Sequence, residues 1–347
     1  MQLLSFTDYT DNIETDIIVK AEEDTIYYQD ASSYLDFNSG LWNVNYGYSR
    51  PDLMKVIVNQ YNRIAYYPNH YNSETDISKK YASELCKLFN YECVYFSNSG
   101  SEAVEISLYD IKGKIYTPTK SYHGSTYRTK KLSWYGQNYT DKLDESVDAV
   151  LIEPIAGNTG VYKIPQEIIE EINYYKDIYN YIIVCDEVTT GMGRSGYDSI
   201  SKKLGINADR LIISKGLANG IMPISATLFN KKPYGEFFYG FTQSGNSLAC
   251  AIGLKCLELK NQIDFKQKSK DINDILIESK LPFRQFGFMI GIDVYNSNYV
   301  RNRLKNEQFL VRDCGEDENT LIISPMFITS INHIKQLIEM IERFNNG

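Results

Sequence analysis

Two short apolar runs that end in charged residues constrain the fold of this chain most. The run at 181–185 ends at Asp186, and the run at 211–213 breaks into Ser214, Lys215 and Gly216. Short apolar runs of this kind are typical of parallel strands that are buried on both faces. The carboxyl ends of such strands form the ligand crevice of an open α/β sheet. We therefore expect Lys215 and Asp186 to face one crevice, although either alone could be a strand-end charge that reaches solvent.

Composition bounds the class of protein. The 347 residues predict one large domain with a smaller one, and the 43% hydrophobic content is that of a globular chain. The formal net charge of −8 argues against a nucleic-acid partner, because such binding depends on clustered lysine and arginine. No apolar stretch approaches the ~18 residues of a membrane span. The first residues do not resemble a secretory signal.

Cysteine and histidine usage adds two expectations. The six cysteines form no CxxC pair and lie mostly in apolar runs, which is typical of reduced core residues in a cytoplasmic protein. Only three histidines occur, so we expect no metal site.

The alternation of strands and helices between about 93 and 229 predicts a mainly parallel central sheet covered on both faces. Residues 1 to about 40 are predicted to form an extended arm with a short strand at 34–37, and 51–61 a helix. The strands expected for the sheet are 93–96, 114–116, 149–153, 182–186, 211–214 and 224–229. Helices are expected at 102–109, 166–179, 199–204, 248–259 and 332–344, and two later strands at 286–294 and 321–324. The predicted domains are an N-terminal arm at 1–45, a large domain at 46–245 and a smaller α/β domain at 246–347.

A small-residue turn opens the helix expected at 102–109. Ser99 and Glu102 have the spacing of a capping box, and the free amides of Gly100 and Ser101 would point at an anion. A helix N-terminus of this type is suited to phosphate. The same residues would fit an ordinary helix cap without a ligand equally well.

Three further segments carry polar groups that suit a bound heterocycle. Tyr122 and His123 precede a glycine and could stack on a flat ring, although core packing explains Tyr122 as well. Glu153 ends a predicted strand and, with Asp186, brings two carboxylates to one sheet edge, which favours a cationic ligand. Thr242, in a polar turn before a helix, could bind phosphate or simply belong to an N-cap region.

A buried lysine opposite a fixed carboxylate is the arrangement that pyridoxal phosphate (PLP) requires. Burial lowers the proton affinity of an amine, so Lys215 could act as nucleophile and base near neutral pH. Asp186 could pair with the protonated ring nitrogen of the cofactor.

Together these segments resemble the class III aminotransferases, PLP enzymes of fold type I. The matching blocks occur in family order and cover about residues 34 to 250. They are LDFNSGLWNVNYGY from Leu35, SGSEA from Ser99, YHG from Tyr122, EP from Glu153, DEVTTGMGRSG from Asp186, SKG from Ser214 and TQSGNSLA from Thr242.

The resemblance assigns a role to each matching residue. Lys215 would hold the cofactor as a Schiff base and carry a proton to and from the substrate. Asp186 would keep the ring nitrogen protonated, while Val188 and Tyr122 would press on opposite ring faces. Ser99, Gly100 and Ser101 would bind the phosphate, and Thr242 would reach it from the second subunit of a homodimer. His123 and Glu153 would complete the cofactor site.

Within the family, the segment around Arg312 resembles the ω-transaminase branch. There, a mobile arginine at this position receives the carboxylate of the keto acid, and Trp42 would line the substrate pocket. The stretches 103–121 and 125–152 are shorter than usual in the family, which leaves the substrate class open.

The resemblance implies a PLP-dependent aminotransferase that moves an amino group from an amine or amino acid to a 2-oxo acid by a ping-pong route. A PLP-dependent racemase or epimerase, or an aminomutase, is the alternative on the same scaffold. A non-catalytic dimeric binding protein that has kept the fold is the third hypothesis. We expect a cytoplasmic homodimer with no membrane or nucleic-acid partner.

Overall fold

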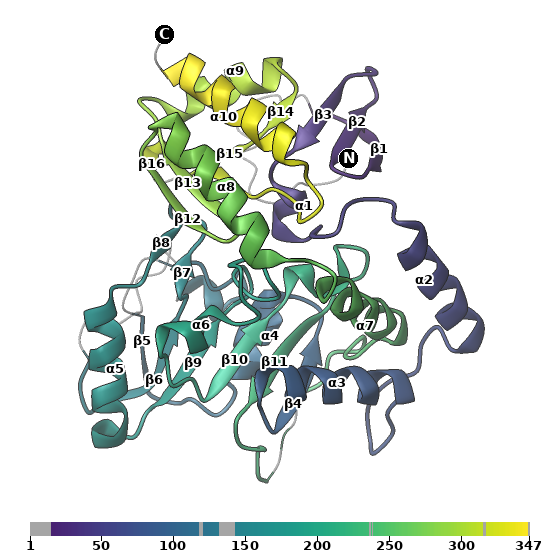
Figure 1. The fold of residues 1–347 in the computed structure, drawn as a ribbon. Helices are drawn as coiled ribbons and strands as arrows, with labels where there is room; N and C mark the ends of the chain where they lie inside the picture. Colours follow the sequence, from purple (N-terminus) through teal and green to yellow (C-terminus); the bar gives the residue numbers. More distant parts are fainter. Residues whose placement is uncertain are drawn as a thin grey trace.

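The structure of the chain is a computed structural model, which describes residues 15–117, 121–131, 143–235, 237, 239–314 and 317–345. A large sheet with its helices fills the lower half of Figure 1, and smaller sheets with the C-terminal helices form the upper half. The first 14 residues of the predicted N-terminal arm lie outside the described residues.

The large sheet has six strands in the order β4-β11-β10-β9-β6-β5. Their bounds are β4 (Cys93–Ser97), β5 (Lys114–Tyr116), β6 (Val147–Ile152), β9 (Ile182–Asp186), β10 (Arg210–Ile213) and β11 (Ser225–Phe229). The pairs β5–β6, β6–β9 and β9–β10 are parallel, whereas β11 is antiparallel to both β10 and β4. The mainly parallel sheet is therefore confirmed, with each strand within two residues of its predicted bounds.

Alternate residues of these strands are buried on opposite faces of the sheet. On one face, Leu151, Val184 and Ile212 pack with two residues of the α4 region. These are Val104 in α4 (Gly100–Ser107) and Leu108, which directly follows the helix. On the other face lie Val150, Ile152, Ile183 and Ile213, in the cluster that also includes residues of α5 (Gln166–Tyr179) and α7 (Ser247–Lys260). Burial on both faces explains why the strands read as continuous apolar runs.

The remaining helices surround the sheets. They are α1 (Ser39–Trp42), α2 (Pro51–Arg63), α3 (Asp76–Phe89), α6 (Ile200–Leu204), α8 (Phe265–Ser279), α9 (Ser297–Asn306) and α10 (Ile331–Asn345), with two 3₁₀ turns at Thr129–Lys131 and Lys215–Ala218. The sequence prediction missed α1, α3, α8 and α9. Helix α7 packs against α2 and α3 of the large domain. These contacts favour a domain boundary after α7 rather than before it. The boundary at 246 stays a prediction.

A second sheet has the order β12-β13-β16-β15, with bounds β12 (Phe283–Phe286), β13 (Met289–Asp293), β15 (Arg312–Cys314) and β16 (Asp317–Ile323). The strand predicted at 286–294 is present as β13 but begins three residues later, and its partner β12 was not predicted. The chain turns at Gly287, whose φ of 61° suits glycine, and β12 and β13 form an antiparallel hairpin around it.

The N-terminal segment is not the extended arm that the sequence predicted. It forms an antiparallel meander of β1 (Ile18–Glu22), β2 (Thr25–Tyr28) and β3 (Ser33–Asp36). Strand β14 (Phe309–Leu310) joins it in parallel to β3, while β7 (Ile155–Ala156) and β8 (Tyr162–Lys163) pair separately. The short strand predicted at 34–37 is present as β3, whereas β1 and β2, each paired with the next strand along the chain, were not predicted.

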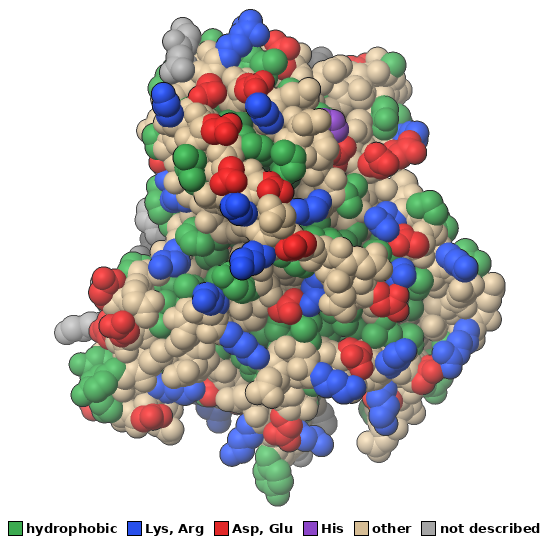
Figure 2. All heavy atoms as spheres, viewed as in Figure 1, with side chains coloured by type: hydrophobic (Ala, Val, Ile, Leu, Met, Phe, Trp, Pro, Cys, Tyr) green, Lys and Arg blue, Asp and Glu red, His purple; other side chains and the backbone are tan. Residues whose placement is uncertain are grey.

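No helix among the described residues is long and apolar enough to cross a membrane. On the face seen in Figure 2, acidic and basic side chains are interspersed, and no basic patch dominates it.

Candidate active site

A cavity of about 550 Å³ lies at the carboxyl ends of the parallel strands. Its lining comes from the segment after β3, the start of α4, the segment 122–124, and the loops that follow β9 and β10. Of the residues predicted for the site, those that line the cavity are Ser99, Gly100, Ser101, Tyr122, His123, Asp186, Val188 and Lys215. The fold thus brings together residues that are up to 116 positions apart in the chain.

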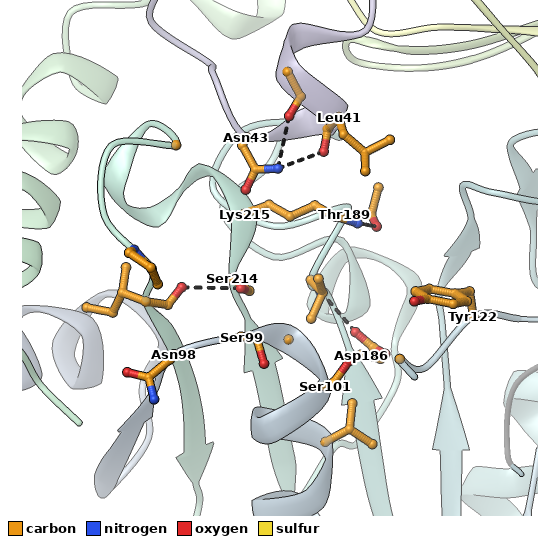
Figure 3. Close-up of a pocket in the computed structure, with 18 of the residues that line it drawn as sticks. Leu41, Asn43, Asn98, Ser99, Ser101, Tyr122, Asp186, Thr189, Ser214 and Lys215 are labelled. Atoms are coloured by element: carbon orange, nitrogen blue, oxygen red, sulfur yellow. Dashed lines mark hydrogen bonds between the residues drawn. The ribbon is translucent and has the colours of Figure 1, made fainter. Parts of the chain in front are cut away.

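Lys215 begins the 3₁₀ turn that follows β10, and its φ of 39° lies in the left-handed region. In Figure 3 its side chain crosses the cavity toward Thr189, whose Oγ1 accepts a hydrogen bond from Nζ at 2.6 Å. Burial lowers the pKa of the Lys215 amine to about 8, although Glu153 and Asp186 act in the opposite direction. The amine is therefore close to losing its proton at neutral pH. Sequence reasoning gave no role to Thr189.

Asp186 ends β9 and is only 3% exposed. Its Oδ1 accepts the amide hydrogen of Val188 at 3.1 Å, and its Oδ2 lies 2.7 Å from Nδ1 of His123. Nε2 of His123 lies 2.7 Å from Oγ of Ser121. Since a carboxylate only accepts, the pairing assigns the proton to Nδ1, and Nε2 then accepts from the Ser121 hydroxyl. The sequence analysis gave Ser121 no role of its own, although it stands two residues before His123.

Glu153 is a second buried carboxyl group near Asp186, as the sequence predicted. Its Oε2 accepts from the backbone of Tyr122 at 3.3 Å and its Oε1 from that of Gly157 at 3.2 Å. Burial, with a contribution from the charge of Asp186, raises the pKa of Glu153 to about 7. Glu153 can therefore carry a proton near neutral pH.

The start of α4 has free backbone donors that face the cavity. Ser99 caps the helix, and its Oγ accepts from the amide of Glu102 at 3.3 Å. The reciprocal half of the predicted capping box is displaced, because the Glu102 carboxylate accepts from the amide of Asn98 at 2.7 Å. The amides of the first turn, which include those of Gly100 and Ser101, have no partner within the helix. Such a terminus attracts anions.

The cavity has the shape and donors that a flat, phosphate-bearing group needs. A Cβ atom at Gly124 would lie 2.3 Å from Oγ of Ser101, and one at Gly100 would lie 3.0 Å from the methyl groups of Val188. Glycine at these positions therefore keeps open the space between α4 and the two flanking loops. Figure 3 places Tyr122 at one side of this space and Asp186 beside it. The residues present fit PLP.

Trp42 and Arg312 lie next to the cavity but do not form its lining. Trp42 is 3% exposed, and its ring centre lies 4.8 Å from Nζ of Lys215 and 4.3 Å from Cζ of Arg312. Nη1 of Arg312 donates to Oδ1 of Asn158 at 3.0 Å. Nη2 of Arg312 and Nε1 of Trp42 are buried without a hydrogen-bond partner among the described residues. Buried donors of this kind call for a partner, which a bound ligand or water could supply.

Thr242 is exposed and does not line the cavity of its own subunit. Its carbonyl oxygen accepts from the hydroxyl of Tyr66 at 2.7 Å, and the next carbonyls, of Ser244 and Gly245, accept from the side chain of Asn69. This loop is therefore held firmly at the surface. No group of three or more His, Cys, Asp or Glu within the described ranges could hold a metal ion.

The fold and the cavity at its strand ends define a PLP-dependent transferase, and comparisons with known proteins support this class. The sequence profile of the family described as "Aminotransferase class-III" matches residues 8–142 and 128–344. The solved structure of an amine transaminase from an uncultivated Pseudomonas species, in its PLP-bound form, superposes with a TM-score of 0.87 at 22% identity over 99% of each chain. A thermostable ω-transaminase variant from Pseudomonas jessenii superposes with a TM-score of 0.88 at 20% identity, over 100% of this chain and 96% of the other.

Similar sequences bear names of the same kind. "Gamma aminobutyrate transaminase 2" of Solanum lycopersicum is 28% identical over 84% of this chain and 80% of its own length. The "Omega-aminotransferase" of Caulobacter vibrioides is 26% identical over 89% of this chain and 88% of its own. The chain therefore belongs to the class III aminotransferases, and it is a PLP-dependent aminotransferase of fold type I. The comparisons give no support to the racemase, epimerase or aminomutase alternatives.

Proposed function

We propose that Lys215 and Asp186 are the catalytic pair of this aminotransferase and that the cavity between them takes an amine or amino acid and then a 2-oxo acid. One observation carries the proposal: the Lys215 amine and the Asp186 carboxylate, from two different strand ends, face the same 550 Å³ cavity. When bound, PLP supplies an aldehyde and an electron-accepting ring.

The residues that would hold the cofactor surround this pair. Ser99, Gly100 and Ser101 would bind its phosphate through the free donors of α4. Tyr122 and Val188 would contact opposite faces of the ring, and their positions in the cavity lining support this role. Glu153 and His123 would complete the site.

Lys215 would move a proton at the substrate α-carbon. A pKa of about 8 lets the free amine release and accept a proton near neutral pH, and the Thr189 hydroxyl orients it. Asp186 would hold the proton on the ring nitrogen, because His123 donates to the carboxylate and stabilises its charge.

Arg312 would bind the carboxylate of the 2-oxo acid, and Trp42 would form part of the substrate site. The buried and unpartnered Nη2 of Arg312 supports this role, since a carboxylate would satisfy it. A plain amine brings no carboxylate, so Arg312 would then keep its contacts with Asn158 and Trp42.

The proposal includes a cytoplasmic homodimer in which Thr242 of one subunit reaches the phosphate of the other. The exposure of Thr242 outside its own cavity supports this arrangement. The six free cysteines support a reducing compartment. For the domains we propose a division at about 45 and 246, and the packing of α7 against α2 and α3 favours moving the second boundary to the end of α7.

A half-reaction tests the proposal. The purified protein, saturated with PLP, is mixed with an amine donor in the absence of any keto acid while the cofactor absorbance is recorded. We expect a stoichiometric loss of the yellow absorbance, which returns when a 2-oxo acid is added. Inverted stereochemistry of the donor without that absorbance change would contradict amino transfer at this site and support a racemase.

A further inference from the structure

Helix α1 (Ser39–Trp42) is a single left-handed turn. The φ angles of Ser39, Gly40, Leu41 and Trp42 are 48°, 53°, 59° and 63°. Its hydrogen bonds run from the amide of Trp42 to the carbonyl of Asn38 at 2.8 Å and from that of Asn43 to Ser39 at 2.9 Å. Three of its four residues are not glycine, and L-residues are disfavoured here because Cβ crowds the following carbonyl oxygen. Such a turn persists only where its surroundings hold it, and strained backbone of this kind gathers at functional sites.

The buried carboxylate of Asp36 holds this turn from the N-terminal side. Its Oδ1 accepts the amide hydrogen of Asn38 at 2.8 Å, and its Oδ2 accepts that of Gly40 at 2.7 Å. Oδ2 also accepts the hydroxyl hydrogen of Tyr48 at 2.7 Å. Asp36 is 5% exposed, so these three donors satisfy a charge that water scarcely reaches. A Cβ atom at Gly40 would lie 2.8 Å from a methyl of Val44 and 3.0 Å from the Tyr48 hydroxyl, so the packing around the turn is tight.

Asn43 holds the turn from the other end. Its Nδ2 donates to the carbonyls of Gly40 at 3.0 Å and Leu41 at 2.9 Å. Figure 3 shows these two bonds directly above the Lys215 side chain. The turn is thus fixed at both ends, and it lies over the reactive amine.

The handedness of the turn decides where two consecutive side chains go. Leu41 lines the cavity and is 51% exposed, whereas Trp42 is buried against Lys215 and Arg312. The buried Nε1 of Trp42 has no partner among the described residues, so the turn delivers an unused donor to the neighbourhood of the amine. A right-handed or extended backbone would send both side chains in other directions.

We infer that Asp36 is a positioning residue of the active site: its carboxylate holds the left-handed turn that fixes Trp42 beside Lys215 and Leu41 in the cavity wall. Asp36 itself does not line the cavity. It therefore shapes the substrate site without contacting the substrate. The inference rests on the proposed function only in that the cavity beside Lys215 receives the substrate. The alternative is that Asp36 contributes only to the stability of the fold and has no effect on the substrate site.

Tryptophan fluorescence separates these two roles. The chain has two tryptophans, so a Trp134→Phe background leaves Trp42 as the single indole. In that background Asp36→Asn keeps the size of the side chain but offers one carbonyl oxygen and an NH₂ group to three donors. We expect a red shift of the Trp42 emission and stronger quenching by acrylamide in the protein without cofactor. We also expect the KM for amine and 2-oxo acid to rise by about tenfold, the order of losing a hydrogen bond to a charged group, with a much smaller change in kcat.

Asp24→Asn is the matched control. Asp24 is a carboxylate of similar burial, at 8% exposed, and its Oδ2 accepts from Nδ1 of His333 at 3.1 Å. Its backbone carbonyl accepts the amide hydrogen of Asp36 at 2.8 Å, a bond that Asp24→Asn keeps, and the side-chain partner that the structure shows for it within the described residues is His333. Its loss should therefore lower the melting temperature without moving the Trp42 emission or the KM. Tyr48→Phe removes one of the three donors and leaves the carboxylate. It should give a smaller shift in the same direction, and it keeps the test decisive if Asp36→Asn fails to fold.

Unchanged Trp42 emission in Asp36→Asn, or in Tyr48→Phe where the former does not fold, would overturn the inference. A changed emission with unchanged KM would overturn it too, because the turn would then not shape the substrate site. Failure of the proposed function is seen separately, as absence of a cofactor adduct at Lys215 in the unmodified protein. The fluorescence of the protein without cofactor does not depend on that adduct.

Discussion

The guanidinium of Arg312 offers the sharpest prediction about substrate binding. Its Nη1 is already bonded to Asn158 at 3.0 Å, whereas its Nη2 is buried without a partner among the described residues. Burial lowers the pKa of Arg312 to about 10, so the group stays charged at neutral pH. A 2-oxo acid that reaches Nη2 gains one new charge-assisted hydrogen bond, while an amine without a carboxylate gains none.

The loss of this one hydrogen bond sets the expected size of the effect on kcat/KM. A hydrogen bond to a charged group contributes ~1.5–3 kcal/mol. Arg312→Ala should therefore lower kcat/KM for the 2-oxo acid by roughly 30-fold, which corresponds to ~2 kcal/mol. The rate of the half-reaction with a plain amine should fall far less. The two half-reactions, measured separately by stopped-flow absorbance of the cofactor, give both values.

Arg284→Ala provides the control for this prediction. Its guanidinium also packs over an aromatic ring, 4.1 Å from the centre of Tyr162, and its two terminal nitrogens bond to Asp293 at 2.6 and 2.7 Å. Because Asp293 already pairs with both terminal nitrogens of Arg284, this guanidinium has no role for a substrate carboxylate, and its loss should leave the ratio of the two half-reactions unchanged. Equal damage to both half-reactions in Arg312→Ala would refute the reasoning.

Two further variants test the electrostatics and the assembly. The raised pKa of Glu153, about 7 against an ordinary 4.5, means that the folded protein binds more protons than the unfolded chain between these pH values, so stability falls as pH rises through this window. Glu153→Gln should flatten this dependence in urea unfolding of the protein without cofactor, and a slope like that of the unmodified protein would contradict it. Thr242→Ala should raise the dissociation constant of PLP by about tenfold, and mixing with Lys215→Ala subunits should restore tight sites in part. An unchanged PLP affinity would remove Thr242 from the phosphate site.

The large sheet and most of the cavity were predictable because both depend on local patterns. Strands β9 and β10 are buried on both faces, so they appear as apolar runs, and their last residues must meet at one edge. Asp186 and Lys215 could therefore be placed together before any contact was known. The start of α4 was predictable for a similar reason, since Ser99 and the glycine after it mark a helix N-terminus.

The parts that were missed depend on distant contacts. Helix α9 buries only Ser297, Val300 and Leu304, which is too short a stripe to predict a helix. Three of the four residues of α1 are not glycine and prefer the right-handed region. The left-handed turn therefore depends on the hydrogen bonds of the Asp36 carboxylate, which a local sequence pattern does not reveal. The contacts of Arg312 with Trp42 and Asn158 join segments that are more than 150 residues apart. No local pattern encodes them.

The most direct test is the identity of the lysine that binds the cofactor. The purified protein is saturated with PLP, reduced with borohydride, digested and examined by mass spectrometry. We expect a reduced cofactor adduct on the peptide that contains Lys215, at its Nζ, and none in Lys215→Ala. An unmodified Lys215, with the adduct on another lysine or on none, would contradict the assignment of this cavity as the catalytic site.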